Sequence, residues 1–162
     1  MKYISSNPGA INYRLAVMVI LILLFIVVFF LKLDESQKEI ERTSIIQTTK
    51  VITSSLAVVF ATYAVKGQLK KLYLLAGGNP FVFLAEYQIL PPSYKGVANS
   101  SELDHLDSGW FYLLDTGTIA YIPRYLEQIS FFKIDLLFDD LNRSELFEPE
   151  EDVQRGLILR KL

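Results

Sequence analysis

The residues best suited to catalysis or metal binding are few, and they form no recognisable pattern. The chain has one histidine, His105, with Asp104 and Asp107 beside it. A single histidine excludes a histidine-rich metal site, and this cluster before Gly109 is more typical of a solvated loop. The absence of cysteine excludes thiolate catalysis, disulfide bonds and cysteine-ligated metals.

Other catalytic motifs are also missing. No serine lies in a Gly-x-Ser-x-Gly turn, and no glycine-rich phosphate-binding loop occurs. Adjacent carboxylates such as Asp139 and Asp140 are usually solvated when they lie in a loop. We therefore expect a protein without enzymatic activity, cofactor or metal.

Composition points to a protein with one strongly apolar segment. The 162 residues are 51% hydrophobic, and 18 acidic against 16 basic residues give a net charge of −2. All the acidic residues follow residue 31, whereas residues 1–14 carry only Lys2 and Arg14. This distribution excludes a basic nucleic-acid-binding protein.

The segment Leu15–Leu31 contains no charged residue, glycine or proline. About 20 apolar residues span a bilayer, and Leu33 extends this segment past Lys32, whose aliphatic stem can reach the headgroups. A cleaved signal peptide has a shorter apolar region followed by small residues, so we expect an uncleaved transmembrane helix over residues 15–33. The basic tail, residues 1–14, predicts a cytoplasmic amino terminus and hence a periplasmic domain anchored in a bacterial inner membrane.

Residues 34–76 are predicted to form a long extramembrane helix. They contain no proline, and apolar residues recur at helical spacing. The run Gly77-Gly78-Asn79-Pro80 is a strong stop signal. A break at residues 32–36 or at Gly67 is equally consistent with the residue types.

Residues 77–138 are predicted to form a small β-containing domain. Gly109–Leu114 and Thr118–Pro123 are rich in β-forming residues and flank a short turn, which predicts a hairpin. Residues 128–138 are a candidate third strand. The charged residues 139–162 are expected to form a loosely ordered tail, with 153–162 as an alternative edge strand. The expected class is α+β, with a small antiparallel sheet after the long helix.

Two groups of residues are candidates for contact with a partner. Small hydroxylated residues, including Thr48 and Ser55, recur along the long helix, where they form either a solvated face or a close-contact face for another helix. Trp110, Tyr112 and Tyr121 belong to an aromatic cluster that either fills the core or leaves some members exposed for protein contact.

The order of these features resembles one known family. The resemblance is carried by a basic tail, an apolar helix, and the segments Glu41–Thr48, Asn79-Pro80, Pro92–Gly96, Gly109–Asp115 and Thr118–Tyr121. In these segments the chain resembles the MshF family of accessory proteins for the mannose-sensitive haemagglutinin (MSHA) type IV pilus. The resemblance spans about residues 12–125. It implies a pilin-like inner-membrane protein of the pilus assembly apparatus, without known catalytic residues.

The amino-terminal residues also resemble a type IV prepilin leader ending at Gly9. Prepilins have glutamate five residues after this glycine, where the present chain has Arg14. We therefore expect no prepilin processing. The expected function is accessory, through contacts with pilins, pseudopilins or assembly proteins of the inner membrane, with lipid around the anchor and self-association as a further contact. The alternatives are a membrane-anchored ligand-binding sensor and an unprocessed minor pilin.

Overall fold

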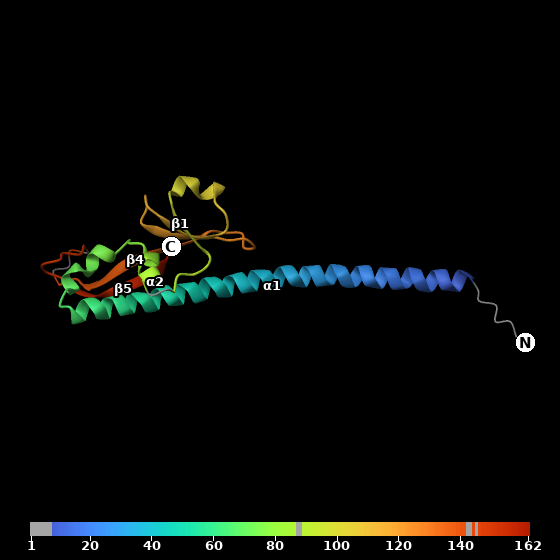
Figure 1. Ribbon diagram of the computed structural model, residues 1–162, viewed down its shortest axis with the longest axis horizontal. Coiled ribbons are helices and arrows are strands. Elements are labelled where there is room, and N and C mark those ends of the chain that lie inside the picture. Colours follow the sequence, from blue (N-terminus) through green and yellow to red (C-terminus); the bar gives the residue numbers. More distant parts are fainter. Residues whose placement is uncertain (1–7, 87–88, 142–143, 145) are drawn as a thin grey trace, which may run out of the picture. The chain divides into compact units, whose positions relative to one another are not determined.

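The computed structural model describes residues 8–86, 89–141, 144 and 146–162, with side chains from residue 13 onward. It divides into two units, residues 1–40 and residues 41–162. The helical elements are α1 (Pro8–Val65), the 3-10 helices η1 (Leu69–Leu75) and η2 (Ser100–His105), and α2 (Pro80–Glu86). The strands are β1 (Tyr94–Ala98), β2 (Gly109–Leu113), β3 (Thr118–Ile122), β4 (Ser130–Asp139) and β5 (Val153–Lys161) (Figure 1).

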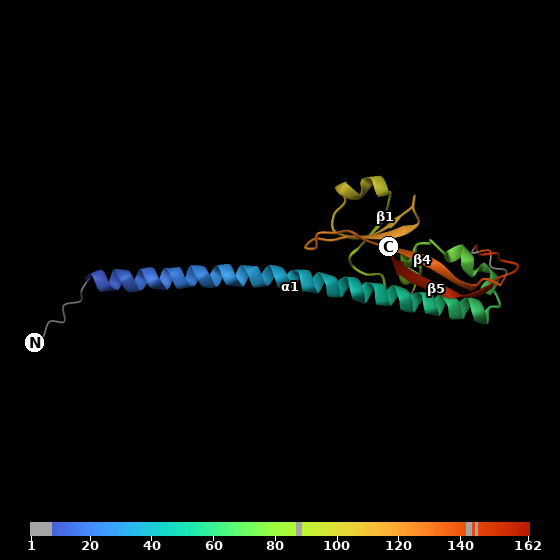
Figure 2. The ribbon, with the colours of Figure 1, turned by 180° about the vertical axis from the view of Figure 1, so that it is seen from behind.

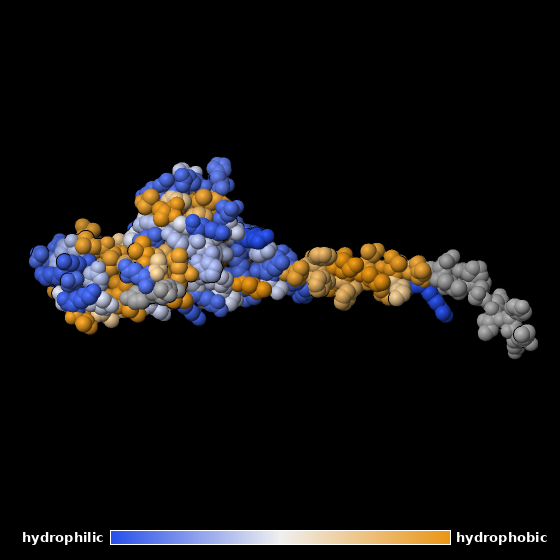
Figure 3. Space-filling view, viewed as in Figure 1, coloured by the Kyte–Doolittle hydropathy of each residue, from blue (hydrophilic) through white to orange (hydrophobic). Residues whose placement is uncertain are grey.

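The first unit contains an apolar helical segment with no protein cover. Every side chain from Leu15 to Leu31 is exposed, and Figure 3 shows this stretch as a continuous hydrophobic surface. In the part of the chain that the structure describes, α1 alone is long and apolar enough to cross a membrane. Because none of this segment is buried, it is not the core helix of a soluble domain. The helix also continues through residues 32–36, so the first of the two breaks that the sequence left open is absent.

The long helix ends earlier than residue 76, which corrects the predicted boundary. It stops at Val65, and Gly67 adopts a left-handed φ of 65°. The Gly67 N–H donates to Ala64 O at 3.0 Å, and the Gln68 N–H donates to Tyr63 O at 2.8 Å. This pair of bonds is a Schellman cap, which satisfies the last carbonyls of the helix and requires a residue tolerant of positive φ. Glycine at position 67 therefore ends the helix ten residues before Gly77.

The sheet has the order β1-β2-β3-β4-β5. The predicted hairpin is confirmed, since β2 and β3 pair antiparallel with Trp110 opposite Tyr121, and the predicted third strand is confirmed as β4. Strand β1, however, runs parallel to β2, so the sheet is mixed and the antiparallel prediction is wrong in this respect. Parallel neighbours need a crossover connection, which η2 provides between these two strands.

The predicted loose tail, residues 139–162, is wrong for its last part, and its residues 142, 143 and 145 lie outside the described ones. Residues 153–161 form β5, which pairs antiparallel with β4 from Phe132–Lys161 to Asp139–Val153. The buried carboxylate of Asp152 accepts hydrogen bonds from the backbone N–H groups of Leu141 and Glu148, at 3.1 and 2.8 Å. These bonds connect Leu141 and Glu148 to the residue that precedes β5. The alternative of an edge strand over residues 153–162 is therefore the one that forms.

Side chains alternate between the two faces of the sheet, as the strand period requires. Trp110 on β2 joins the core beneath α1 and α2, whereas its neighbour Phe111 joins a smaller cluster that includes Leu103 of η2. Figure 2 shows α1 and η2 on opposite sides of the sheet. The principal core contains Ile52, Leu56, Phe81, Leu84, Trp110, Ile119, Tyr121, Phe132 and Ile134.

The parallel pairing of β1 with β2 depends on the absence of a side chain at Gly109. Its φ is 150°, and a Cβ there would lie 2.6 Å from Ser93 O and 2.7 Å from Lys95 Cγ. We expect Gly109→Ala to lower the free energy of unfolding by about 2–3 kcal/mol through strain and this clash. Urea unfolding followed by the fluorescence of Trp110 measures the loss.

Gly96→Ala is the matched control for this prediction. Gly96 has a φ of 124°, but nothing lies within 4 Å of its hypothetical Cβ. The control variant therefore carries backbone strain without the clash, and its loss should be smaller. Equal losses for the two variants would show that the close approach at Ser93 is unimportant.

Candidate functional site

Four of the five candidate contact residues lie inside the domain. Trp110 is 0% exposed, and Thr48, Ser55 and Tyr121 are also buried. Tyr112 is half-buried, and its hydroxyl donates to Gly77 O at 2.7 Å. This burial agrees with the core alternative for Trp110 and Tyr121, and contact of any of these five residues with a partner stays a prediction.

The hydroxylated residues of α1 have a packing explanation. Thr48 and Ser55 lie on the same helix face as Ile52 and Leu56, which are 0% exposed. The Ser55 hydroxyl donates to Ile52 O at 2.7 Å, so burial leaves it no unsatisfied donor. These short side chains suit a helix packed closely on a sheet.

The polar candidates remain dispersed on the surface. His105, Asp104 and Asp107 are exposed at or just after η2. Among the described residues, no group of three or more potential ligands could hold a metal ion. Asp139 instead forms an ion pair with Arg155, and the hydrogen bonds from that guanidinium lower the pKa of the Asp139 carboxyl.

Glu41, the first residue of the second unit, has a buried carboxylate with several hydrogen-bond donors around it. Glu41 is 7% exposed, and its carboxylate accepts one hydrogen bond from a side chain of β3 and three from the connection between β3 and β4. The donors are the Tyr121 hydroxyl at 2.9 Å and the backbone N–H groups of Arg124, Tyr125 and Leu126 at 2.7, 2.9 and 2.9 Å. A buried carboxylate is stable only when its oxygens are satisfied in this way. Glu41 therefore fastens α1 to the end of the hairpin.

These bonds also determine the ionisation of both side chains. Burial acts to raise the pKa of Glu41, but the combined hydrogen bonds from Arg124, Tyr125, Tyr121 and Leu126 outweigh it, and its pKa is lowered. Burial and the neighbouring carboxylate raise the pKa of Tyr121. Glu41 thus contributes stability above the pKa of an unfolded glutamate, and this contribution is lost as the pH falls through its lowered folded pKa.

Glu41 received no individual role from the sequence, although it begins the segment Glu41–Thr48 that carries the family resemblance. One signal could have identified it. Positions 41, 45, 48, 52, 56 and 59 follow a single helix face, and Glu41 is the charged member of this otherwise apolar or hydroxylated row. A charge in such a row implies burial with compensating donors.

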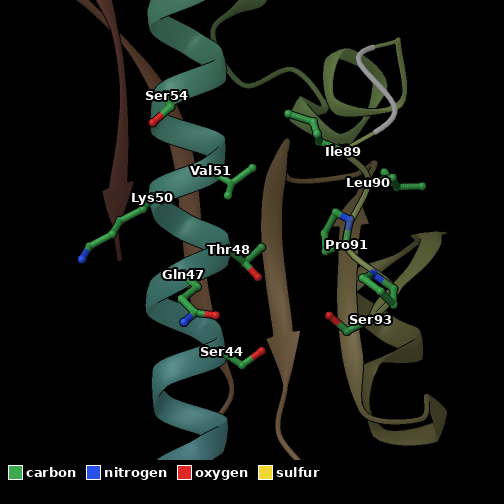
Figure 4. Close-up of a pocket in the computed structure, with 11 residues that line it drawn as sticks. Ser44, Gln47, Thr48, Lys50, Val51, Ser54, Ile89, Leu90, Pro91 and Ser93 are labelled. Carbon is green, nitrogen blue, oxygen red and sulfur yellow. The ribbon is translucent and has the colours of Figure 1, made fainter.

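A groove runs along the part of α1 that follows Glu41. It has a volume of about 690 Å³, and we call it the contact groove. Its lining residues are Ser44, Gln47, Thr48, Lys50, Val51 and Ser54 on α1, and Ile89, Leu90, Pro91, Pro92 and Ser93 on the opposite wall. In Figure 4, Thr48 and Val51 point from α1 toward the Ile89–Pro91 segment, whereas Lys50 points to the other side of the helix.

The contact groove is lined mainly by neutral side chains. Among its described lining residues, aliphatic, proline, hydroxyl and amide groups predominate, and none is a carboxylate or histidine. Grooves of this size and polarity accept apolar ligands or apolar protein segments, with hydroxyl and amide groups providing orientation. Lys50 is the one charged side chain among its described lining residues.

Comparisons with known proteins found no matching protein-family model, no similar curated protein and no similar solved structure.

Proposed function

We propose that this chain is a non-enzymatic, membrane-anchored accessory protein of MSHA-type pilus biogenesis, located in a bacterial inner membrane. The observation that carries the proposal is the exposed apolar segment Leu15–Leu31 in a helix that also contributes to an α+β domain. This combination is consistent with a pilin-like protein. The sequence resemblance supplies the assignment to pilus assembly, and Arg14 argues against processing as a filament subunit.

The contact groove is the best-supported surface for a partner in this role. Val51 is 40% exposed and Leu90 is 41% exposed, on its two walls. An apolar or hydroxylated segment of a pilin, a pseudopilin or an inner-membrane assembly protein would bury these side chains without leaving a charge unpaired. Such contacts gain free energy from apolar burial and shape, and they need no catalytic group.

Crosslinking in living cells tests this proposal directly. A photoreactive residue is placed at Val51 or Leu90, with Leu137, 46% exposed on β4, as the control position. We expect captured pilins or assembly-platform proteins, identified by mass spectrometry, from the two groove positions and not from Leu137. Capture only of a kinase or transporter would overturn the pilus assignment, and equal capture from all three positions would overturn the role of the groove.

The topology follows from the basic tail and is tested separately. The chain has no cysteine, so a single introduced cysteine is a specific label. We expect a membrane-impermeant maleimide to label Leu114→Cys in intact spheroplasts and to label Ser5→Cys only after lysis. The reverse pattern would place the domain in the cytoplasm and contradict the proposed location.

A sensor is the second candidate, because the contact groove also has the size of a small-molecule site. In that case a small apolar ligand, and not a protein segment, occupies the groove. Filling it by Thr48→Trp or Val51→Trp would then abolish binding of an apolar fluorescent probe to the wild-type protein. Loss of pilin crosslinking in the same variants, without any probe binding by the wild type, would favour the protein-contact function.

A further inference from the structure

Charge is distributed unequally over the two sides of the sheet in the unit 41–162. From Arg42 to Ala85 there are five lysines and arginines and no aspartate or glutamate. These residues include the part of α1 that covers one face of the sheet. The opposite face is covered by η2, where Glu102, Asp104 and Asp107 are exposed (Figure 2). The stretch Arg42–Ala85 is therefore basic, whereas exposed carboxylates gather at and just after η2.

The basic side contains a second groove, between α1 and the β4–β5 strand pair. Its volume is about 470 Å³, and we call it the basic groove. Phe132 and Leu159 provide an apolar lining, and Lys50 and Lys161 provide the charge. Both lysines are exposed, and neither has an ionic partner within the described part of the chain. No described residue lining this groove is acidic.

The surface at η2 combines carboxylates with one exposed apolar side chain. Asp104 and Asp107 have no ionic partner among the residues described. Leu114 is 64% exposed. The Leu114 N–H donates to Ala98 O at 3.0 Å, which holds Leu114 next to the start of η2. We call this surface the acidic tip.

We infer that the basic groove of one copy binds the acidic tip of a second copy of this chain. The two surfaces complement each other in charge, with Lys50 and Lys161 facing Asp104 and Asp107, and each offers an apolar component. Because they lie on opposite sides of the sheet, the contact is head-to-tail, and each copy retains one free groove and one free tip. Such contacts extend into rows unless their rotation closes a ring.

The contact is weak for a single pair and sensitive to salt. Exposed ion pairs contribute little individually, and their attraction is screened within about 8 Å at physiological ionic strength. Reversing two of the charges should therefore weaken the association about tenfold at low salt and much less at high salt. The inference is independent of the pilus assignment, since it concerns only surfaces of this chain.

Cysteine crosslinking of the full-length protein in lipid vesicles tests the inference. One population carries Thr53→Cys in the basic groove and another, of different tag length, carries Leu114→Cys at the acidic tip. Under mild oxidation we expect a mixed Thr53–Leu114 dimer. Lys50→Glu with Lys161→Glu in the first population should reduce its yield about tenfold, and Asp104→Lys with Asp107→Lys in the second should then restore it.

The matched control replaces Leu114→Cys by Val82→Cys, which is 54% exposed on α2. This position lies outside both surfaces, so it should give only background crosslinking. Thermal unfolding of each charge variant confirms that its fold is intact. A mixed dimer no more abundant than the control, a yield unaffected by charge reversal, or no recovery in the doubly reversed pair would each overturn the inference.

Discussion

Replacing Trp110 with alanine should lower the free energy of unfolding of the domain by about 3–5 kcal/mol, the usual cost of deleting a fully buried aromatic side chain. Trp110 is 0% exposed and joins three elements. Its ring lies 6.2 Å from that of Phe81 on α2, 4.9 Å from Tyr121 on β3 and 5.5 Å from Phe132 on β4. Domains are stable by only about 5–15 kcal/mol, so this loss removes a large share of the total.

Pulse proteolysis in urea measures this effect, because the variant lacks the only tryptophan of the chain. Trp110→Phe is the informative comparison. The indole Nε1 has no hydrogen-bond partner among the described residues, so phenylalanine loses volume but no hydrogen bond. It should therefore cost less than alanine, whereas Val97→Ala on the surface should change stability by under about 0.5 kcal/mol. A loss for Trp110→Ala as small as that for Val97→Ala would contradict the assigned core.

Replacing Glu41 with alanine should cost about 3 kcal/mol, since it removes the acceptor of four hydrogen bonds. The Tyr121 hydroxyl and the N–H groups of Arg124, Tyr125 and Leu126 then need new partners. The connection between β3 and β4 is partly exposed, so water can replace some of the lost bonds and limit the cost. Urea unfolding followed by the fluorescence of Trp110 provides the measurement.

The dependence of the free energy of unfolding on pH, on the acid side, distinguishes the role of the Glu41 charge from the role of its packing. The wild type should lose the Glu41 contribution below the pKa of a free glutamate, about 4.5, as the carboxylate becomes protonated. Glu41→Gln keeps the size of the side chain but cannot ionise, so its stability should depend less on pH in this range. Glu127→Gln, at an exposed position, is the matched control. If the free energy of unfolding fell with acid pH equally in the wild type and in Glu41→Gln, the proposed contribution of the Glu41 charge to stability would be excluded.

Features that depend on residues close together in the sequence were predictable from the sequence. The span Leu15–Leu31 follows from an uninterrupted apolar run, and the β2–β3 hairpin follows from two β-prone segments around the turn at residues 115–117. Strand β4 follows from the same propensity. In each case the favourable conformation depends on residue types within a few positions, so a linear pattern is sufficient.

The end of the long helix shows where linear patterns become ambiguous. Gly67 and Gly77 are both acceptable caps, and the apolar spacing continues between them. The structure selects Gly67, where the Schellman bonds form, and the residues that follow it form η1. Strand β5 is a second ambiguous case. The charged residues that precede it in the sequence suggested disorder, whereas pairing with β4 and the hydrogen bonds to Asp152 stabilise it.

Sequence alone thus determined the apolar span, the α+β class and the central hairpin, because these depend on local composition and period. Tertiary structure decided the parallel β1, the order of β5, the burial of Trp110 and Tyr121, and the role of Glu41. Each of these depends on groups far apart in the chain, such as Glu41 and the residues after β3. Their contacts form only when the helix packs on the sheet, and no linear pattern specifies which distant donors a buried carboxylate will meet.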